Sequence, residues 1–281
     1  MIKHIICGSD GSTYGAAAEA MALDLGAKLG AYVRGIHVVD TALISGAFIS
    51  DISGSLGFEP FLRLQAQVEQ SLQELAQLLK ERFLTKAQEA NVRGKFQIHH
   101  GSTVDRLCEE AQSADLLVIG QRGTAAANHR DFLGATAARL LRRCPVPLLL
   151  TPEQASLPKR PLAAFDGSVK AIRALLLAGN LAASLAVPLK VIALGPEEAQ
   201  ANARLEQAAE LLAPFNAKVS FQWERCEVVE QALLALLDPC EYDMLFMGAH
   251  GHRRIVEAVL GSTTEYVTRR SPVPVLCITR A

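Results

Sequence analysis

Three glycines in the C-terminal part of the chain have the spacing of a phosphate-binding loop. Gly248 and Gly251 follow an apolar run, and nine residues then precede Gly261, Ser262 and Thr263. Glycine lets backbone amides approach an anion without a Cβ in the way, and a helix beginning at Gly261 would add unpaired N–H donors and a partial positive charge. The two hydroxyls are further donors, so the pattern suits a polyphosphate. The alternative is that these glycines only form a tight turn between a strand and a helix.

Several other sequence patterns that carry chemistry are absent. The sequence has neither the P-loop pattern GxxxxGK[ST] nor a GxGxxG fingerprint after its first apolar run, which disfavours a P-loop NTPase and a dinucleotide-dependent oxidoreductase. It also has no nucleophile elbow and no HExxH motif. His250 and His252 flank Gly251, but no third ligand lies nearby in sequence, so no metal site is expected. We expect no catalytic residues, and at most slow nucleotide hydrolysis.

The composition excludes several classes of protein. Hydrophobic residues make up 50% of the 281 positions and charged residues 20%, which excludes global disorder. The net charge of −1 lacks the basic surplus of a sequence-independent nucleic-acid binder. No apolar run reaches the roughly 20 residues of a membrane span, and the N-terminus does not resemble a signal peptide. Six cysteines without a CxxC pair predict free thiols, inert in the core at Cys7 and Cys277. We therefore expect a cytoplasmic protein without membrane or nucleic-acid partners.

The chain contains an internal repeat. Three blocks occur twice in the same order, 156, 128 and 127 residues apart, so the first half carries 28 extra residues between its first two blocks. We expect this insertion at about 41–60, a Gly/Ser-rich stretch, together with a longer following helix. A polar, proline-rich linker separates the halves, which predicts domains at 1–152 and 160–281. The paired blocks are Asp10–Ser12 with Asp166–Ser168, Asp115–Gly123 with Asp243–Gly251, and Pro145–Leu149 with Pro272–Leu276.

Short apolar runs alternate with helix-period segments in each half. In the first half we expect strands near 2–7, 32–38, 96–99, 116–119 and 146–150, and a long helix whose apolar stripe runs from Leu64 to Phe83. Alternating strands and helices predict an α/β fold with two tandem, doubly wound, five-stranded parallel sheets of Rossmann-like type. Such sheets bind ligands beyond the carboxyl ends of their strands. Asp10, Asp166 and both glycine turns are expected there.

The combination of these motifs resembles the universal stress protein family. An Asp after the first strand, Gly-x-x-Gly, nine residues, Gly-Ser and a closing Pro-Val-Pro-Val-Leu occur together in the second half, and related blocks occur in the first. The resemblance implies the adenine nucleotide alpha hydrolase-like version of the fold, and an ATP site in the second half. There Asp166 would lie beside the adenine, Ala193 would offer its backbone to the base and Gly248 would lie near the ribose. The phosphates would be held by Gly251, His252, Gly261, Ser262 and Thr263.

The first half departs from this motif. Ten residues, rather than nine, separate Gly123 from Gly134, and Ala135 replaces the hydroxyl residue. An extra residue reshapes the loop, and the lost hydroxyl removes a donor. The resemblance therefore predicts one working site and one degenerate site. The matching first-half positions are Asp10, Val38, Gly120, Gly123 and Gly134.

The resemblance implies a stress-response protein that binds ATP, with ADP or AMP left open, together with Mg²⁺, and that acts as a sensor or regulator with unknown protein partners. A nucleotide-independent interaction or chaperone-like protein is the alternative, because the segment Ile44–Phe58 is unusually apolar for a linker. The resemblance also implies pairing through the last strands. The two halves would then form a pseudo-dimer within one chain, and two chains could dimerise further.

Overall fold

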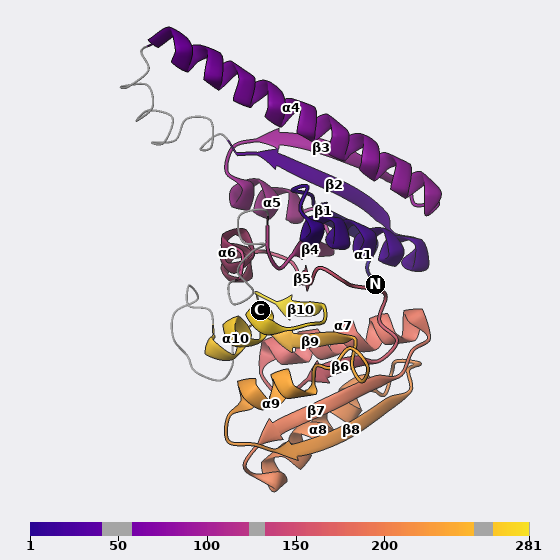
Figure 1. Cartoon of the computed structure of the whole chain (residues 1–281). Coiled ribbons are helices and arrows are strands. Elements are labelled where there is room, and N and C mark those ends of the chain that lie inside the picture. Colours follow the sequence, from indigo (N-terminus) through magenta and orange to yellow (C-terminus); the bar gives the residue numbers. More distant parts are fainter. Residues whose placement is uncertain (41–57, 124–132, 250–260, 281) are drawn as a thin grey trace.

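The computed structural model describes residues 1–40, 58–123, 133–249 and 261–280. The strands of this part form one ten-stranded sheet (Figure 1). The first half contributes β1 (His4–Gly8), β2 (Tyr32–Val39), β3 (Gly94–His100), β4 (Leu116–Gly120) and β5 (Leu148–Thr151). The second half contributes β6 (Pro161–Ala164), β7 (Leu189–Gly195), β8 (Val219–Arg225), β9 (Met244–Gly248) and β10 (Val275–Ile278).

The strand order is β3-β2-β1-β4-β5-β10-β9-β6-β7-β8. All strand pairs within a half are parallel, which confirms the doubly wound arrangement of five strands predicted for each half. The last strands of the halves, β5 and β10, pair antiparallel, with Leu149 opposite Leu276. The two halves therefore share one continuous sheet within a single chain.

Helices cover both faces of this sheet. One face carries α1 (Thr13–Leu29), α4 (Phe58–Glu89), α7 (Val169–Leu185) and α8 (Glu198–Leu212), whose buried residues belong to one core that runs through both halves. The other face carries α5 (Thr103–Ala111), α6 (Ala135–Arg143), α9 (Val229–Leu236) and α10 (Ser262–Arg270) over a second core. Burial of both faces explains why the strands read as continuous apolar runs.

The helices after the first strands begin and end where local signals require. Ser12 caps α1 by accepting a hydrogen bond from the Gly15 amide, and Ser168 caps α7 in the same way from Ala171. Gly30 ends α1 with φ of 62°, a left-handed conformation that glycine adopts without strain. These caps place the residues before them, Asp10 and Asp166, at the carboxyl ends of β1 and β6.

The helix α4 is the largest difference between the halves. It has 32 residues where α8 has 15, and its N-terminal end projects beyond the sheet (Figure 1). Leu79 and Phe83 of its predicted stripe are buried, whereas Leu75 is 38% exposed and Leu78, beside the stripe, is 63% exposed. Most of the expected insertion at 41–60 and nearly all of the Ile44–Phe58 segment lie outside the described residues.

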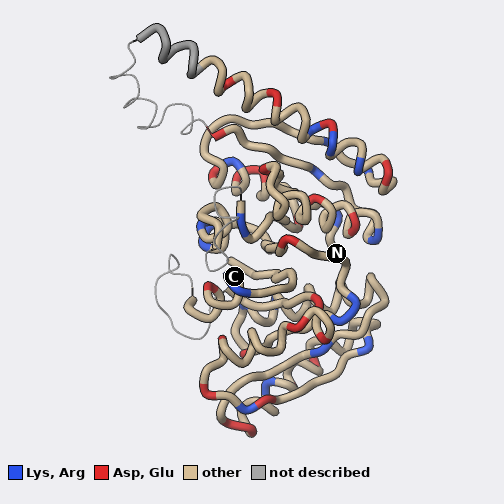
Figure 2. The backbone as a smooth tube through the Cα atoms, viewed as in Figure 1, with Lys and Arg blue, Asp and Glu red and all other residues tan. Residues whose placement is uncertain are grey.

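Charges of both signs are interleaved along both halves (Figure 2). No helix in the described part of the chain has the length and apolarity needed to cross a bilayer.

Candidate functional site

The two acidic residues after the first strands form matching turns. Asp10 Oδ1 accepts a hydrogen bond from the Ser12 amide at 3.0 Å, and Asp166 Oδ1 accepts one from the Ser168 amide at 2.9 Å. Both carboxylates thus lie between a strand end and a helix N-terminus. In the second half, β6 has β7 on one side and β9 on the other, so Asp166 stands at the switch point where doubly wound sheets bind ligands.

Gly248 ends β9 directly against the start of α7. A Cβ at this position would lie 2.9 Å from the Ala171 amide nitrogen and 3.0 Å from Lys170 Cβ, so only glycine allows this approach. The same packing brings Lys170, in the first turn of α7, beside the glycine turn. Sequence reasoning missed this cation, although its position four residues after Asp166 could have indicated it.

The helix α10 begins at the second part of the glycine motif. Gly261 is its N-cap residue with extended backbone angles, and it makes no side-chain capping hydrogen bond. Ser262 is exposed, and Thr263 Oγ1 donates to Glu230 Oε2 of α9 at 3.3 Å. Gly261 therefore leaves the first amides of the helix without a cap from its own position, and two hydroxyls stand in the same turn. Glu230 is a second residue that the motif did not reveal. Gly251 and His252 lie outside the described residues.

The position of Ala193 corrects one match between the halves. The ladder pairs Ala164 with Ile192 in the second half and Gly8 with Ile36 in the first. Ala193 is therefore equivalent to His37, and the match with Val38 is wrong by one residue. Alternate residues of a strand point to opposite faces of the sheet. His37 therefore lies on the face covered by α1, whereas Val38 lies on the face covered by α5.

The first half brings its predicted glycines together. The Gly134 amide donates to the Gln121 carbonyl at 2.9 Å, and a Cβ on Gly123 would lie 2.9 Å from Asp10 Oδ2. Gly120 packs on Tyr14, as Gly248 packs on Lys170. Asp10, Gly120, Gly123 and Gly134 are thus close in space, in a turn that leaves little room around the carboxylate.

An aromatic side chain and an arginine occupy this region of the first half. Tyr14 takes the place that Lys170 has in the second half, and Arg122 Nη1 donates to its hydroxyl at 2.8 Å. The guanidinium also lies over the Tyr14 ring, 5.4 Å from its centroid. The lysine of the second half is therefore replaced, in the first half, by a tyrosine whose hydroxyl is bound by an arginine.

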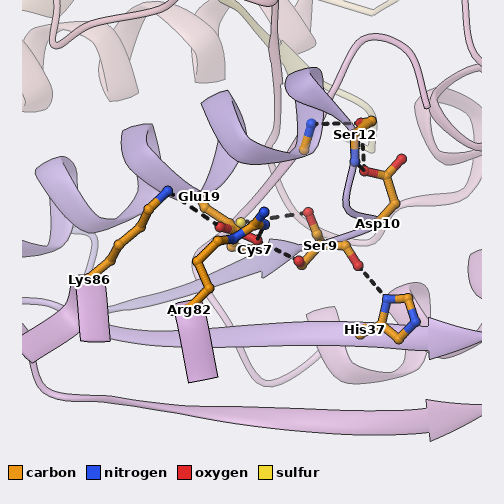
Figure 3. A network of polar contacts seen from close by, with 10 residues as sticks. Cys7, Ser9, Asp10, Ser12, Glu19, His37, Arg82 and Lys86 are labelled. Carbon is orange, nitrogen blue, oxygen red and sulfur yellow. Dashed lines mark hydrogen bonds and ion pairs between the residues drawn. The ribbon is translucent and has the colours of Figure 1, made fainter. Parts of the chain in front are cut away.

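A buried polar network adjoins Asp10 in the first half (Figure 3). The fully buried Glu19 accepts hydrogen bonds from Ser9 Oγ at 2.5 Å and from Arg82 Nη2 at 2.6 Å, and Lys86 Nζ lies 4.0 Å from its other oxygen. His37 Nδ1 lies 2.7 Å from the Ser9 carbonyl oxygen. Apolar residues hold the equivalent places in the second half: Phe165 for Ser9, Leu175 for Glu19 and Ala193 for His37.

The buried thiols are unsuited to chemistry at neutral pH. Desolvation by burial, reinforced by the Glu19 charge, raises the pKa of Cys7 well above its ordinary value. Burial also raises the pKa of Cys277 to about 12. Both thiols therefore stay protonated and poorly nucleophilic. The described residues contain no group of three or more potential metal ligands.

Two doubly wound α/β units that share one sheet, each with an Asp at its first strand and a glycine turn at its fourth, define a tandem Rossmann-like protein. The model of the universal stress protein family matches residues 1–152 and 158–279. The chain belongs to this family.

Relatives match over nearly the whole chain. The universal stress protein Slr1230 of Synechocystis is 30% identical over 288 residues, covering 98% of this chain and 99% of the relative. The crystal structure of a universal stress protein from Archaeoglobus fulgidus has a TM-score of 0.74 at 23% identity, covering 99% of this chain and 98% of its own. A universal stress protein structure from Pseudomonas aeruginosa has a TM-score of 0.62 at 14% identity, covering 99% and 93%. These likenesses confirm the fold.

Proposed function

We propose that this protein is a cytoplasmic stress-response protein that binds ATP chiefly in its second half, 160–281, and acts as a nucleotide-dependent sensor or regulator. The observation that carries the proposal is the start of α10. Its first-turn amides carry no side-chain cap from Gly261, and the Ser262 and Thr263 hydroxyls lie beside them. Asp166, Ala193 and Gly248, at or near the carboxyl ends of three adjacent strands, would hold the nucleoside, and Gly251 and His252 would complete the phosphate loop.

The residues at this helix also suit a magnesium-bound nucleotide. Thr263 and Glu230 offer a hydroxyl and a carboxylate oxygen 3.3 Å apart, and Mg²⁺ prefers oxygen ligands together with phosphates. Lys170 would supply a positive charge near the ribose and phosphates. The bound ion would offset the repulsion between Glu230 and the phosphates.

The first half supports a weaker site or none. Asp10, Gly120, Gly123 and Gly134 are close together, but the Tyr14–Arg122 pair lies where the second half has Lys170. We therefore expect one ATP per chain, measured by mass spectrometry of the small molecules that the denatured protein releases.

Matched substitutions at the two helix starts test the proposal. Ser262→Asp places a negative charge among the expected phosphates, and Ala135→Asp places one at the equivalent exposed position of α6. Either carboxylate should slightly stabilise its helix. We expect Ser262→Asp to weaken ATP binding by roughly tenfold or more, about 1.4 kcal/mol, and Ala135→Asp to leave it unchanged. Unchanged ATP affinity in Ser262→Asp, measured by titration calorimetry with Mg²⁺, would disprove the assignment.

A nucleotide-independent interaction protein is the second candidate. The exposed Leu75 and Leu78 on α4 favour it, because they could contact a client. Failure of the wild-type protein to bind added ATP, combined with protection of unfolded clients that ATP does not alter, would favour this candidate. Dimerisation of two chains remains a prediction for either function.

A further inference from the structure

The glycine turn of the first half reaches into the second half. Gln121 Nε2 donates to the Ser271 carbonyl at 3.1 Å, and Arg122 Nη2 donates to the Arg269 carbonyl at 3.0 Å. Ser271 is the C-cap residue of α10, and Arg269 lies in its last turn. The final carbonyls of a helix lack partners within the helix, so the first half supplies donors at the place where α10 needs them.

Both donors are held rigidly. Gln121 is 1% exposed, so its amide has little freedom to turn elsewhere. Arg122 is fixed by the Tyr14 hydroxyl at 2.8 Å and by its position over the Tyr14 ring. Its positive charge also faces the negative end of the α10 dipole, a favourable arrangement. The contact is therefore a preorganised clamp, formed by Gln121 and Arg122, on one end of α10.

The opposite end of α10 is the start of the proposed phosphate site. The helix has nine residues, which at 1.5 Å per residue is about 14 Å. Such a short helix moves as a rigid body, so fixing its C-terminus fixes the direction and depth of its N-terminal amides. We propose that Gln121 and Arg122 are positioning residues for ATP binding at Gly261–Thr263, so that the degenerate half serves as a support for the working site. This inference rests on the proposed function.

The reverse contact is built differently. Thr279 Oγ1 of the second half donates to the carbonyls of Cys144 at 2.6 Å and Val146 at 3.3 Å, at and just beyond the end of α6. The residue equivalent to Gln121 in the second half is Ala249, whose methyl group has no donor. Within the described residues, the side-chain amide contact from Gln121 therefore has no counterpart from the second half, and it acts on the helix that carries the intact motif.

The test compares loss of the clamp with loss of the reverse contact. The variant Gln121→Met/Arg122→Met removes both donors to α10, and Thr279→Val removes the donor to α6 while leaving α10 untouched. We expect the double variant to weaken binding of ATP with Mg²⁺ by roughly 5- to 20-fold, measured by calorimetry well below the unfolding temperature. Thr279→Val should change it by less than about twofold, even if both variants unfold at similarly lowered temperatures. Arg122→Lys alone, which keeps one donor, should retain more affinity than Arg122→Met alone.

Hydrogen exchange separates this inference from the function on which it rests. Without any nucleotide, the hydrogen-bonded amides of α10, from the Glu265 amide that donates to the Gly261 carbonyl onward, should exchange faster in the double variant than in wild type, and Thr279→Val should leave them unchanged. Equal ATP affinity in wild type and the double variant would overturn the positioning role. If the wild-type protein binds no ATP, the proposed function fails, and the exchange rates alone then decide whether the first half holds α10.

Discussion

The two halves share one fold but carry chemically different residues at equivalent positions. Glu19 is the clearest case, because a fully buried carboxylate stands where the second half has the buried Leu175. A buried charge is tolerated only when it is paired and hydrogen-bonded. Ser9 and Arg82 meet this requirement, and Arg82 comes from the extended helix α4. The network thus ties α4 to α1 and belongs to the half that carries the longer helix.

Removing one partner of the Glu19–Arg82 ion pair should lower the stability of the fold more than replacing both partners with apolar residues. Arg82→Met leaves the Glu19 charge with only Ser9 and the distant Lys86, and we expect a loss of about 2–3 kcal/mol, reduced by solvent because Arg82 is 35% exposed. Glu19→Leu/Arg82→Met, which imitates Leu175, should recover most of that loss. Urea denaturation of the three proteins measures both steps. A double variant no more stable than Arg82→Met would show that the network has packing roles beyond its charges.

At the scale of elements, the ends of a helix can be predicted from the sequence where nearby residues determine them. Both ends of α1 coincide with signals that stand in the sequence, because a Ser cap precedes the helix and a glycine follows it. The insertion was expected to extend to about residue 60, before a helix whose apolar stripe becomes regular at Leu64. The helix already begins at Phe58, because proline is tolerated in a first helical turn.

Contacts between distant elements could not be predicted in this way. The clamp of Gln121 and Arg122 on α10 joins residues about 150 positions apart and depends on which strands become neighbours. The equivalence of Ala193 with His37 needed the strand register, since a shift of one residue reverses the face. The glycine motif indicated a phosphate site, but its neighbours Lys170 and Glu230 come from other helices.

Two buried thiols predict how the stability of the protein depends on pH. Burial raises the pKa of Cys144, at the end of α6, and of Cys277, in β10, from the ordinary thiol value of 9.0 to about 12. The pKa of each thiol is higher in the folded protein than in the unfolded chain. The stability that depends on the protonated thiols is therefore fully present below pH 9 and is lost as the pH rises above 9. Between pH 9 and 10, each thiol should lower the free energy of unfolding by about 1 kcal/mol. Thermal unfolding of Cys144→Ala/Cys277→Ala should show a shallower decline there.

The exposed Cys240 provides the control for this effect. Folding does not bury this side chain, so Cys240→Ala should reproduce the wild-type decline. An unchanged slope in Cys144→Ala/Cys277→Ala would mean that other groups govern stability at alkaline pH.

On the scale of the whole molecule, the seam between β5 and β10 joins the halves into one sheet. Leu148, Leu149, Leu150, Leu276 and Cys277 are fully buried there, and one core runs through both halves. Pairing also covers two strand edges that would otherwise invite aggregation. Separation of the halves would expose this surface to water, so the two halves should unfold together despite their separate motifs.

Cooperative unfolding can be tested with the single tryptophan. Trp223 lies in β8 and reports on the second half, whereas far-UV circular dichroism reports on both halves. In wild type the two urea transitions should coincide.

Leu149→Asp buries an unpaired charge opposite Leu276 and should lower the free energy of unfolding by about 3–5 kcal/mol. It should also separate the transitions, because it weakens the seam itself. Leu23→Ala, at a buried core position of α1 outside the paired strands β5 and β10, should lower both midpoints together. Transitions that already differ in wild type would show that the shared sheet does not couple the halves.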